Sequence, residues 1–141
     1  DLILKRLRFR TLKAKSLTVN DMQDCRNIKV WNESHQLALK VYKITSEFPK
    51  SEMFNLTSQL RRACVSIPNN IPEGCGRNSD KDFLRFLHIA LGSTNETLYL
   101  LILSKDLKLI TEEIFKELED KVEKVKAMLL AFIKTINNRL A

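Results

Sequence analysis

A single apolar seam near the C-terminus limits the folds open to this chain more than any other pattern in it. Its members step by three and four residues: Phe115, Leu118, Val122, Val125, Leu129, Phe132 and Ile136. That spacing places every member on one face of an α-helix, and so apolar a face must be buried. Thr111 precedes the seam as a candidate N-cap, followed by Glu112 and Glu113, where the helix dipole favours negative charge. The seam predicts a long helix that packs lengthwise on other helices.

Three more helices are predicted upstream from the same kind of spacing. The first begins near residues 32–34 and ends before Pro49, because proline cannot continue a helix. The second follows Asn55, a candidate N-cap, and the third runs from Ser79 to near residues 105–108. Their apolar faces comprise Leu37, Val41, Ile44 and Phe48 in the first, Leu60, Cys64, Ile67 and Ile71 in the second, and Phe83, Leu87, Ala90, Thr94, Leu98 and Leu101 in the third.

Four comparable helices with short loops predict an all-α domain, an antiparallel up-down-up-down four-helix bundle over residues 22–141. The three glycines and three prolines are too few for the turns of an all-β domain. Pro68 and Pro72 interrupt the second helix, so we expect a kink or an early end there. Gly92 costs about 1 kcal/mol relative to alanine in mid-helix, which indicates a close backbone approach.

Residues 1–21 differ from the rest of the chain and are predicted to be a basic N-terminal extension. The net charge is +7, and residues 1–27 hold seven basic against three acidic side chains. Three interpretations of the extension stay open: a basic arm, a loosely packed extension, or a non-native or upstream-translated segment. Asp21 and Asp24 disfavour an amphipathic, Arg-rich presequence. Met22 is a candidate start of the protein.

Motifs for catalysis, metal binding or cofactor binding are missing from the sequence. His35 and His88 are isolated, and the Glu-x-x-His motif of di-iron bundles does not occur. A phosphate-binding loop and a nucleophile elbow are also missing. Gly74-Cys75-Gly76 is interpreted as a helix stop and tight turn, with an anion site beside Arg77 and Lys81 as the alternative. We therefore predict a protein that is not an enzyme and needs no metal or cofactor.

Cysteine usage and hydropathy bear on the compartment. Cys25, Cys64 and Cys75 are odd in number and lack C-x-x-C spacing, which favours a reduced, cytoplasmic environment. No apolar run reaches the roughly 20 residues that a membrane span needs, so no membrane partner is expected.

Two polar stripes accompany the apolar faces of the second and third helices. The first holds Ser58, Arg62, Ser66, Asn69, Glu73 and Arg77, provided that the helix persists through Pro68, and the second holds Lys81, Arg85, His88 and Gly92. Three interpretations stay open: a solvated face, a polar network between helices or subunits, and direct phosphate binding.

Several motifs in and around these stripes resemble, in order, the bacterial four-helix-bundle family of 23S rRNA intervening-sequence proteins. They are Leu56-Thr57-Ser58-Gln59-Leu60-Arg61-Arg62-Ala63-Cys64-Val65-Ser66-Ile67-Pro68, Glu73-Gly74-Cys75-Gly76-Arg77 and Asp82-Phe83-Leu84-Arg85-Phe86-Leu87. The resemblance covers residues 22–137 and leaves residues 1–21 outside it. Asn55, Pro72 and residues 97–100 depart from the family's usual residues.

The resemblance implies an up-down-up-down bundle assembled as a ring-shaped homopentamer. Members of the family are encoded in insertions of the large-subunit rRNA gene or as separate bacterial genes. A related branch comprises the accessory proteins of diversity-generating retroelements, whose basic pentamer is understood to bind nucleic acid and a reverse transcriptase. RNA, DNA and a reverse transcriptase are therefore the partners that the resemblance suggests.

Our leading interpretation is a non-enzymatic oligomer that binds nucleic acid through phosphate contacts. The candidate site residues are Arg61, Arg62, Arg77, Lys81 and Arg85. Few aromatic residues lie near these arginines, so we expect little base stacking and modest sequence specificity. The alternative is an oligomeric protein-interaction scaffold, in which the arginines build the assembly and the partner is another protein.

Overall fold

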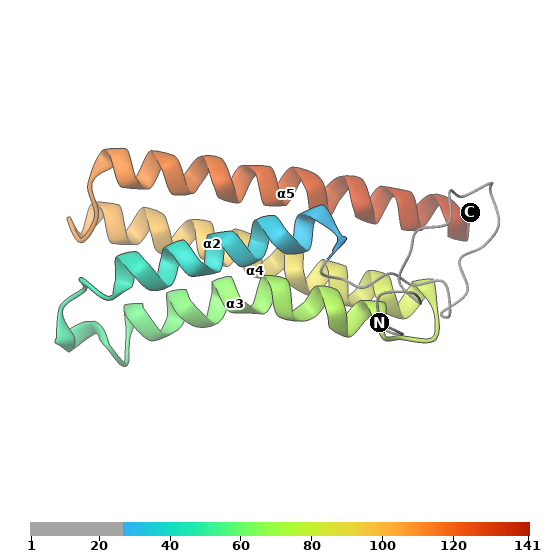
Figure 1. The fold of residues 1–141 in the computed structure, drawn as a ribbon, viewed down its shortest axis with the longest axis horizontal. Coiled ribbons are helices and arrows are strands. Elements are labelled where there is room, and N and C mark those ends of the chain that lie inside the picture. Colours follow the sequence, from blue (N-terminus) through green and yellow to red (C-terminus); the bar gives the residue numbers. More distant parts are fainter. Residues whose placement is uncertain (1–26) are drawn as a thin grey trace.

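The computed structural model describes residues 27–141, which form four α-helices and one short 3-10 helix. The elements are α2 (Lys29–Thr45), η3 (Lys50–Glu52), α3 (Leu56–Cys75), α4 (Asp80–Asp106) and α5 (Glu112–Leu140). Figure 1 shows the four α-helices lying lengthwise beside one another, joined by short connections. The predicted all-α four-helix bundle is confirmed. Cys25, the candidate start at Met22 and the extension over residues 1–21 lie outside the described residues.

Contacts between helices show that neighbours run antiparallel. Along the α3–α4 pair, Ser66 meets Ser93 while Gly74 meets Phe83, so residue numbers rise on one helix as they fall on the other. The α2–α5 pair has the same order in its two ion pairs, which are Lys40–Glu117 and Glu33–Lys124. Each helix packs against two others in the ring order α2, α3, α4, α5, which is the packing of an up-down-up-down bundle.

The predicted apolar faces form the core of the bundle. Most of their members are buried, among them Leu37 and Val41 of α2, Leu60, Cys64, Ile67 and Ile71 of α3, Leu87, Ala90 and Leu101 of α4, and Leu118, Val122, Val125, Leu129 and Ile136 of α5. One step of the α5 seam differs from the prediction, since Ile133 is buried and Phe132 is half-buried. Phe132 packs edge to face on Phe83, with ring centroids 5.3 Å apart.

Helix caps follow the sequence in two of three places. Ser79 Oγ accepts a hydrogen bond of 3.1 Å from the Asp82 backbone N–H, and Thr111 Oγ1 likewise caps α5. Asn55 occupies the N-cap position of α3, but its side chain accepts no hydrogen bond there. The carboxylate of Glu52 instead accepts from the Leu56 N–H at 3.3 Å, so an acidic side chain from η3 replaces the expected amide cap.

Two helix boundaries differ from the prediction. α2 begins at Lys29, ahead of the predicted residues 32–34, because Val30 is buried in the core and extends the apolar face by two turns toward the N-terminus. Pro68 and Pro72 do not end α3 early, since the helix continues through both to Cys75. Tertiary packing outweighs the backbone bonds that proline removes.

Among residues 27–141, close backbone approach occurs at Gly74 and not at Gly92, where the sequence predicted such an approach. A Cβ at Gly74 would lie 2.5 Å from Phe83 Cδ2 and 3.0 Å from Phe86 Cβ, so only glycine lets α3 meet the start of α4 this closely. A Cβ at Gly92 would have no atom within 4 Å in the described part of the chain, and Gly92 is exposed. The helix-breaking cost of Gly92 is therefore unexplained by packing among residues 27–141.

α4 is the most apolar of the four helices. It therefore qualifies the expectation that no segment of the chain is long and apolar enough for a membrane span. Within residues 27–141 it is the one helix that is long and apolar enough to cross a membrane, with a window of mean hydropathy 1.2. Its side chains Phe83, Leu87 and Leu101 are nevertheless buried in the bundle core. The helix packs on both α3 and α5.

Candidate nucleic-acid interface

The polar stripes on α3 and α4 both face away from the core. Because α3 continues through Pro68, the first stripe shares one helical face, and none of its six members is buried. All four members of the second stripe are exposed. A polar network between helices or subunits was one of three open interpretations, and within residues 27–141 it amounts to a hydrogen bond of 2.7 Å from the Ser93 hydroxyl to Ser66 Oγ, which also accepts from Asn70 Nδ2 at 3.0 Å.

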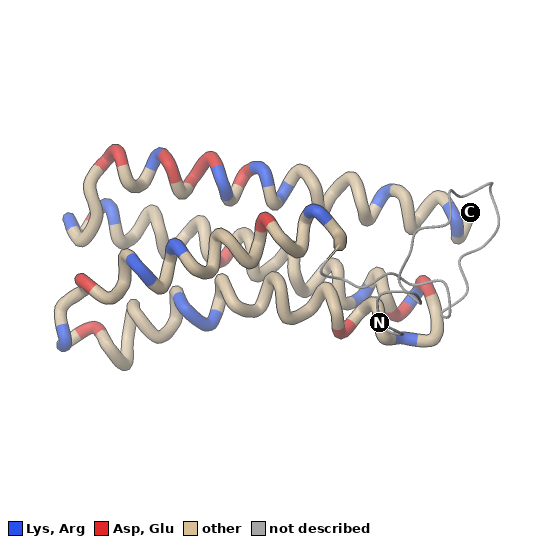
Figure 2. The backbone as a smooth tube through the Cα atoms, viewed as in Figure 1, with Lys and Arg blue, Asp and Glu red and all other residues tan. Residues whose placement is uncertain are grey.

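The structure places the five predicted site residues in two groups. Arg61 and Arg62 lie in the first half of α3, whereas Arg77, Lys81 and Arg85 lie around the α3–α4 turn and the start of α4. At 1.5 Å of rise per residue, Arg62 lies about 20 Å along the helix axis from Cys75, the last residue of α3, and Arg77 lies just beyond that end. Figure 2 shows the corresponding basic segments of α3 and of the turn separated by a stretch without basic residues.

Arg77 and Arg85 share one aromatic ring, and we call these two residues with Phe86 the Phe86 cluster. Their guanidinium carbons lie 4.6 Å and 4.7 Å from the centroid of the Phe86 ring. The positive charges are thus at most twice that distance apart, within the Debye length of about 10 Å at 0.1 M salt. Phe86 is only 8% exposed, and the stems of the arginines help to cover it. The cluster holds two cations together by cation–π contact.

Arg61 is held against α2 by two contacts. Its Nε donates a hydrogen bond of 2.8 Å to Thr45 Oγ1, and its guanidinium carbon lies 4.6 Å from the centroid of the Tyr42 ring. Thr45 Oγ1 in turn donates to the Val41 carbonyl at 2.7 Å. These contacts fix the direction of the Arg61 side chain and leave its terminal nitrogens for other acceptors.

Carboxylate partners are scarce for the predicted site residues. Within residues 27–141, Arg61, Arg62, Lys81 and Arg85 form no ion pair. Arg77 pairs with Glu73 at 3.5 Å, but both side chains are about half exposed, so this contact is weak and screened by salt. A phosphate can therefore bind these cations with little free energy lost from existing ion pairs.

Acidic residues also lie near the α3–α4 turn, and two of them pair with arginines. Glu73 faces Arg77, and Asp80 lies 3.8 Å from Arg139 at the end of α5. Asp82 is exposed in the first turn of α4. Lys81 and Arg85 are thus the cations at this end that carry no carboxylate of their own among the described residues.

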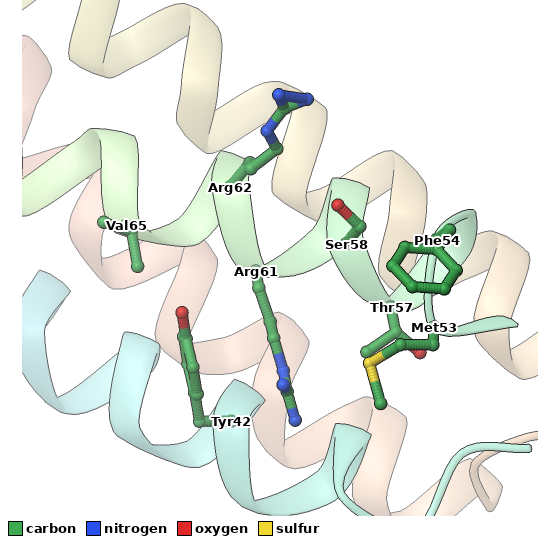
Figure 3. A pocket seen from close by; sticks show the side chains of 8 residues that line it. All are labelled: Tyr42, Met53, Phe54, Thr57, Ser58, Arg61, Arg62 and Val65. Atoms are coloured by element: carbon green, nitrogen blue, oxygen red, sulfur yellow. The ribbon is translucent and has the colours of Figure 1, made fainter. Parts of the chain in front are cut away.

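A hollow of about 330 Å³ opens beside Arg61 and Arg62, and we call it the Arg62 hollow. Its lining consists of Tyr42, Met53, Phe54, Thr57, Ser58, Arg61, Arg62 and Val65. Figure 3 shows Tyr42 and Arg61 side by side between α2 and α3, and Phe54 projecting from the connection that precedes α3. Phe54 is 93% exposed. Two arginines, two aromatic rings and no carboxylate therefore line one opening.

Aromatic neighbours of the arginines were missed by the sequence interpretation. The expectation of few aromatic residues near the arginines is wrong, because Tyr42, Phe54 and Phe86 all adjoin them in space. Phe86 directly follows Arg85 and could have been noticed. Tyr42 lies on a different helix from Arg61, so no local pattern predicts that they meet.

Other chemistry-bearing side chains contribute little to a site. Within the part of the chain that the structure describes, no three His, Cys, Asp or Glu side chains are grouped to hold a metal ion. His35 stacks on Trp31, with ring centroids 5.0 Å apart. Burial raises the pKa of the Cys64 thiol to about 12, so this thiol stays protonated and unreactive at neutral pH.

Known proteins resemble this chain in sequence and in fold. The family described as 23S rRNA-intervening sequence protein matches residues 26–131. A crystal structure of a protein of unknown function from the S23 ribosomal protein family of Bacteroides thetaiotaomicron VPI-5482 superposes with a TM-score of 0.68 and 30% sequence identity. The alignment covers 74% of this chain and 98% of that chain. Among curated proteins, none matches.

Proposed function

Because the chain belongs to the family of 23S rRNA-intervening sequence proteins, we propose that it is a non-enzymatic, oligomeric protein that binds nucleic acid. The phosphate contacts come from Arg61, Arg62, Arg77, Lys81 and Arg85. The observation that carries this proposal is the Phe86 cluster, in which two guanidiniums are held together over one ring. The protein acts in the cytoplasm, and its nucleic acid is RNA or DNA.

The Phe86 cluster suits a phosphate better than it suits a protein carboxylate. Two adjacent cations repel each other, and a bound phosphodiester relieves that repulsion for both at once. Arginine presents its donors in a planar fork that matches phosphate geometry. Lys81 lies one turn before Arg85 on the same exposed face of α4 and adds a further cation without a carboxylate partner among residues 27–141.

A salt titration tests this function. We expect wild-type protein to bind both rRNA-like and random RNA at low salt, with affinity falling steeply as salt rises through counterion release. Arg62→Ala and Arg85→Ala should each reduce the slope of log affinity against log salt by about 1. Lys134→Ala, an exposed cation on α5 without an ion pair among the described residues, serves as the matched control. Absence of RNA binding at low salt rejects the proposal.

The oligomeric part of the proposal rests on the outer face of α4. Ile89 is 42% and Tyr99 is 60% exposed on this helix, and the surface over Gly92 is open. An exposed helix face that holds Ile89, Gly92 and Tyr99 suits close packing against a second copy of the chain. A homopentamer is the assembly that the family resemblance suggests, and the mass of the protein in solution checks it.

A protein-interaction scaffold is the second candidate function, favoured by the same exposed face of α4. Here the arginines build the oligomer, and a reverse transcriptase is the partner that the resemblance suggests. The double variant Arg62→Ala/Arg85→Ala separates the two functions. Loss of assembly favours the scaffold, whereas an intact oligomer that no longer binds RNA favours nucleic-acid binding.

A further inference from the structure

We propose that the Arg62 hollow receives an unpaired nucleotide, with its base against Phe54 and its phosphate at Arg62. This inference rests on the proposed nucleic-acid binding and deepens it, because it names single-stranded nucleic acid as the preferred ligand. The occupant is inferred from three independent features of the hollow. These are an exposed aromatic ring, an uncompensated pair of arginines and a buried hydroxyl without a partner.

Phe54 is the first feature. It is 93% exposed, the highest fraction among the large apolar side chains of residues 27–141. It lies in the connection that leads into α3, directly before the N-cap Asn55, so the helix start holds its backbone in place. Both faces of a ring this exposed are available, and an aromatic face stacks on a base of any sequence. The apolar side chains Met53 and Val65 extend the wall beside it.

The charge of the hollow is the second feature. Arg61 and Arg62 both line it, while no acidic side chain of residues 27–141 belongs to its lining. Arg61 is fixed by Thr45 and Tyr42, and Arg62 is exposed with no hydrogen bond or ion pair to any described residue. An anion is thus the ligand that complements this opening. An apolar protein segment would leave both charges without a partner.

The third feature is Thr57, whose residue is 1% exposed and lines the hollow. Its Oγ1 is the one buried side-chain polar atom in the described part of the chain that has no hydrogen-bond partner. A buried polar group left unpaired costs free energy, and rotation of this side chain toward a ligand in the hollow would give the hydroxyl a partner. The hydroxyls of Thr57 and the neighbouring Ser58 can both donate and accept, as the edges of bases require.

The combination indicates an unpaired nucleotide and not a duplex. A phosphate backbone alone needs the arginines but has no use for Phe54, Met53 and Val65. In a duplex the base faces are stacked inside the helix and cannot reach an aromatic side chain. The volume of about 330 Å³ lies at the lower end of the range of roughly 300–1,000 Å³ that takes small organic ligands.

The decisive experiment compares single-stranded RNA with a duplex of the same sequence, by fluorescence anisotropy at one fixed salt concentration. We expect Phe54→Ala to weaken binding of the single strand by about 5- to 100-fold and to leave duplex binding unchanged. Phe54→Trp should restore the single-strand affinity, because tryptophan keeps the stacking surface. Leu107→Ala is the matched control, since Leu107 is likewise an exposed apolar residue in a connection between helices.

A photocrosslink locates the contact. RNA that carries 4-thiouridine should crosslink to Met53 or Phe54. Peptide mass spectrometry identifies the crosslinked residue. Equal single-strand affinity for wild type and Phe54→Ala, with RNA still bound through the arginines, overturns this inference alone. A change of oligomer mass in Phe54→Ala also overturns it, because Phe54 would then lie between subunits. Absence of any RNA binding by the wild type overturns both this inference and the proposed function.

Discussion

Gly74 and Phe83 meet so closely that a Cβ on the glycine would lie 2.5 Å from ring atom Cδ2 of the phenylalanine. This contact joins the last turn of α3 to the first turn of α4. Arg77 lies in the short connection between the two helices, and Arg85 follows on α4. The glycine therefore controls how closely the two arginines of the Phe86 cluster are brought together.

Gly74→Ala should destabilise the protein by about 1–3 kcal/mol, because the added methyl overpacks a contact that cannot open without moving a helix. Urea denaturation followed by circular dichroism measures the change. Gly76→Ala is the control, since its Cβ would have its nearest neighbour, the Pro72 carbonyl oxygen, at an ordinary 3.6 Å. Equal stability of the two variants would show that the α3–α4 contact is not tight.

Gly92→Ala should have opposite effects on the subunit and on its assembly. In the isolated subunit it should stabilise α4 by about 1 kcal/mol, since nothing within 4 Å opposes the methyl and alanine is the better helix former. If a second copy packs on this face, the same methyl should weaken the assembly. Thermal unfolding at low concentration and light scattering at high concentration measure the two effects. An unchanged oligomer mass at all concentrations would place the subunit interface elsewhere.

Lys108→Gly should stabilise the protein by about 1 kcal/mol. Lys108 is the one residue other than glycine with positive φ in the described range, at 63°, where the Cβ of an L-residue is strained. Its N–H bonds to the Lys105 carbonyl at 2.9 Å, so the turn after α4 keeps this conformation. Leu107→Gly, one residue earlier at φ −79°, should destabilise instead. The difference in melting temperature between the two variants checks the prediction.

Cys64 should make stability fall at alkaline pH. Burial raises the pKa of this thiol from 9.0 to about 12, so the unfolded chain releases the proton at a lower pH than the folded protein does. Stability is therefore unaffected below pH 9 and decreases between pH 9 and 12, by at most about 1.4 kcal/mol per pH unit. Comparison with Cys64→Ala isolates the effect. Parallel pH profiles for both proteins would contradict the assigned pKa.

The helices could be predicted well where one apolar face carries the signal. Ser79 and Thr111 cap their helices as the sequence indicates, and the α5 seam from Phe115 to Ile136 is buried almost as predicted. The prediction failed where tertiary packing overrides a local rule. Pro68 and Pro72 disfavour helix locally, yet the buried side chains Ile67 and Ile71 hold their turns in the bundle.

The candidate site was predictable in its charges but not in its surroundings. The spacing of Arg62, Arg77 and Arg85 indicated exposed cations, and their exposure follows from the amphipathic pattern. The contact between Arg61 and Tyr42 joins two helices, so it depends on the bundle geometry and not on either segment alone. The same limit applies to Gly92, for which the sequence indicated a close backbone approach, since the space beside it is open among the described residues.

The continuity of α3 through its two prolines fixes the distance between the two groups of arginines. Because α3 is continuous from Arg62 to Cys75, it separates the Arg62 hollow from the Phe86 cluster by roughly 20 Å along its axis. The helix therefore sets the shortest nucleic-acid segment that can contact both groups of arginines. An oligonucleotide shorter than this can occupy one group of arginines but cannot bridge both on a single subunit.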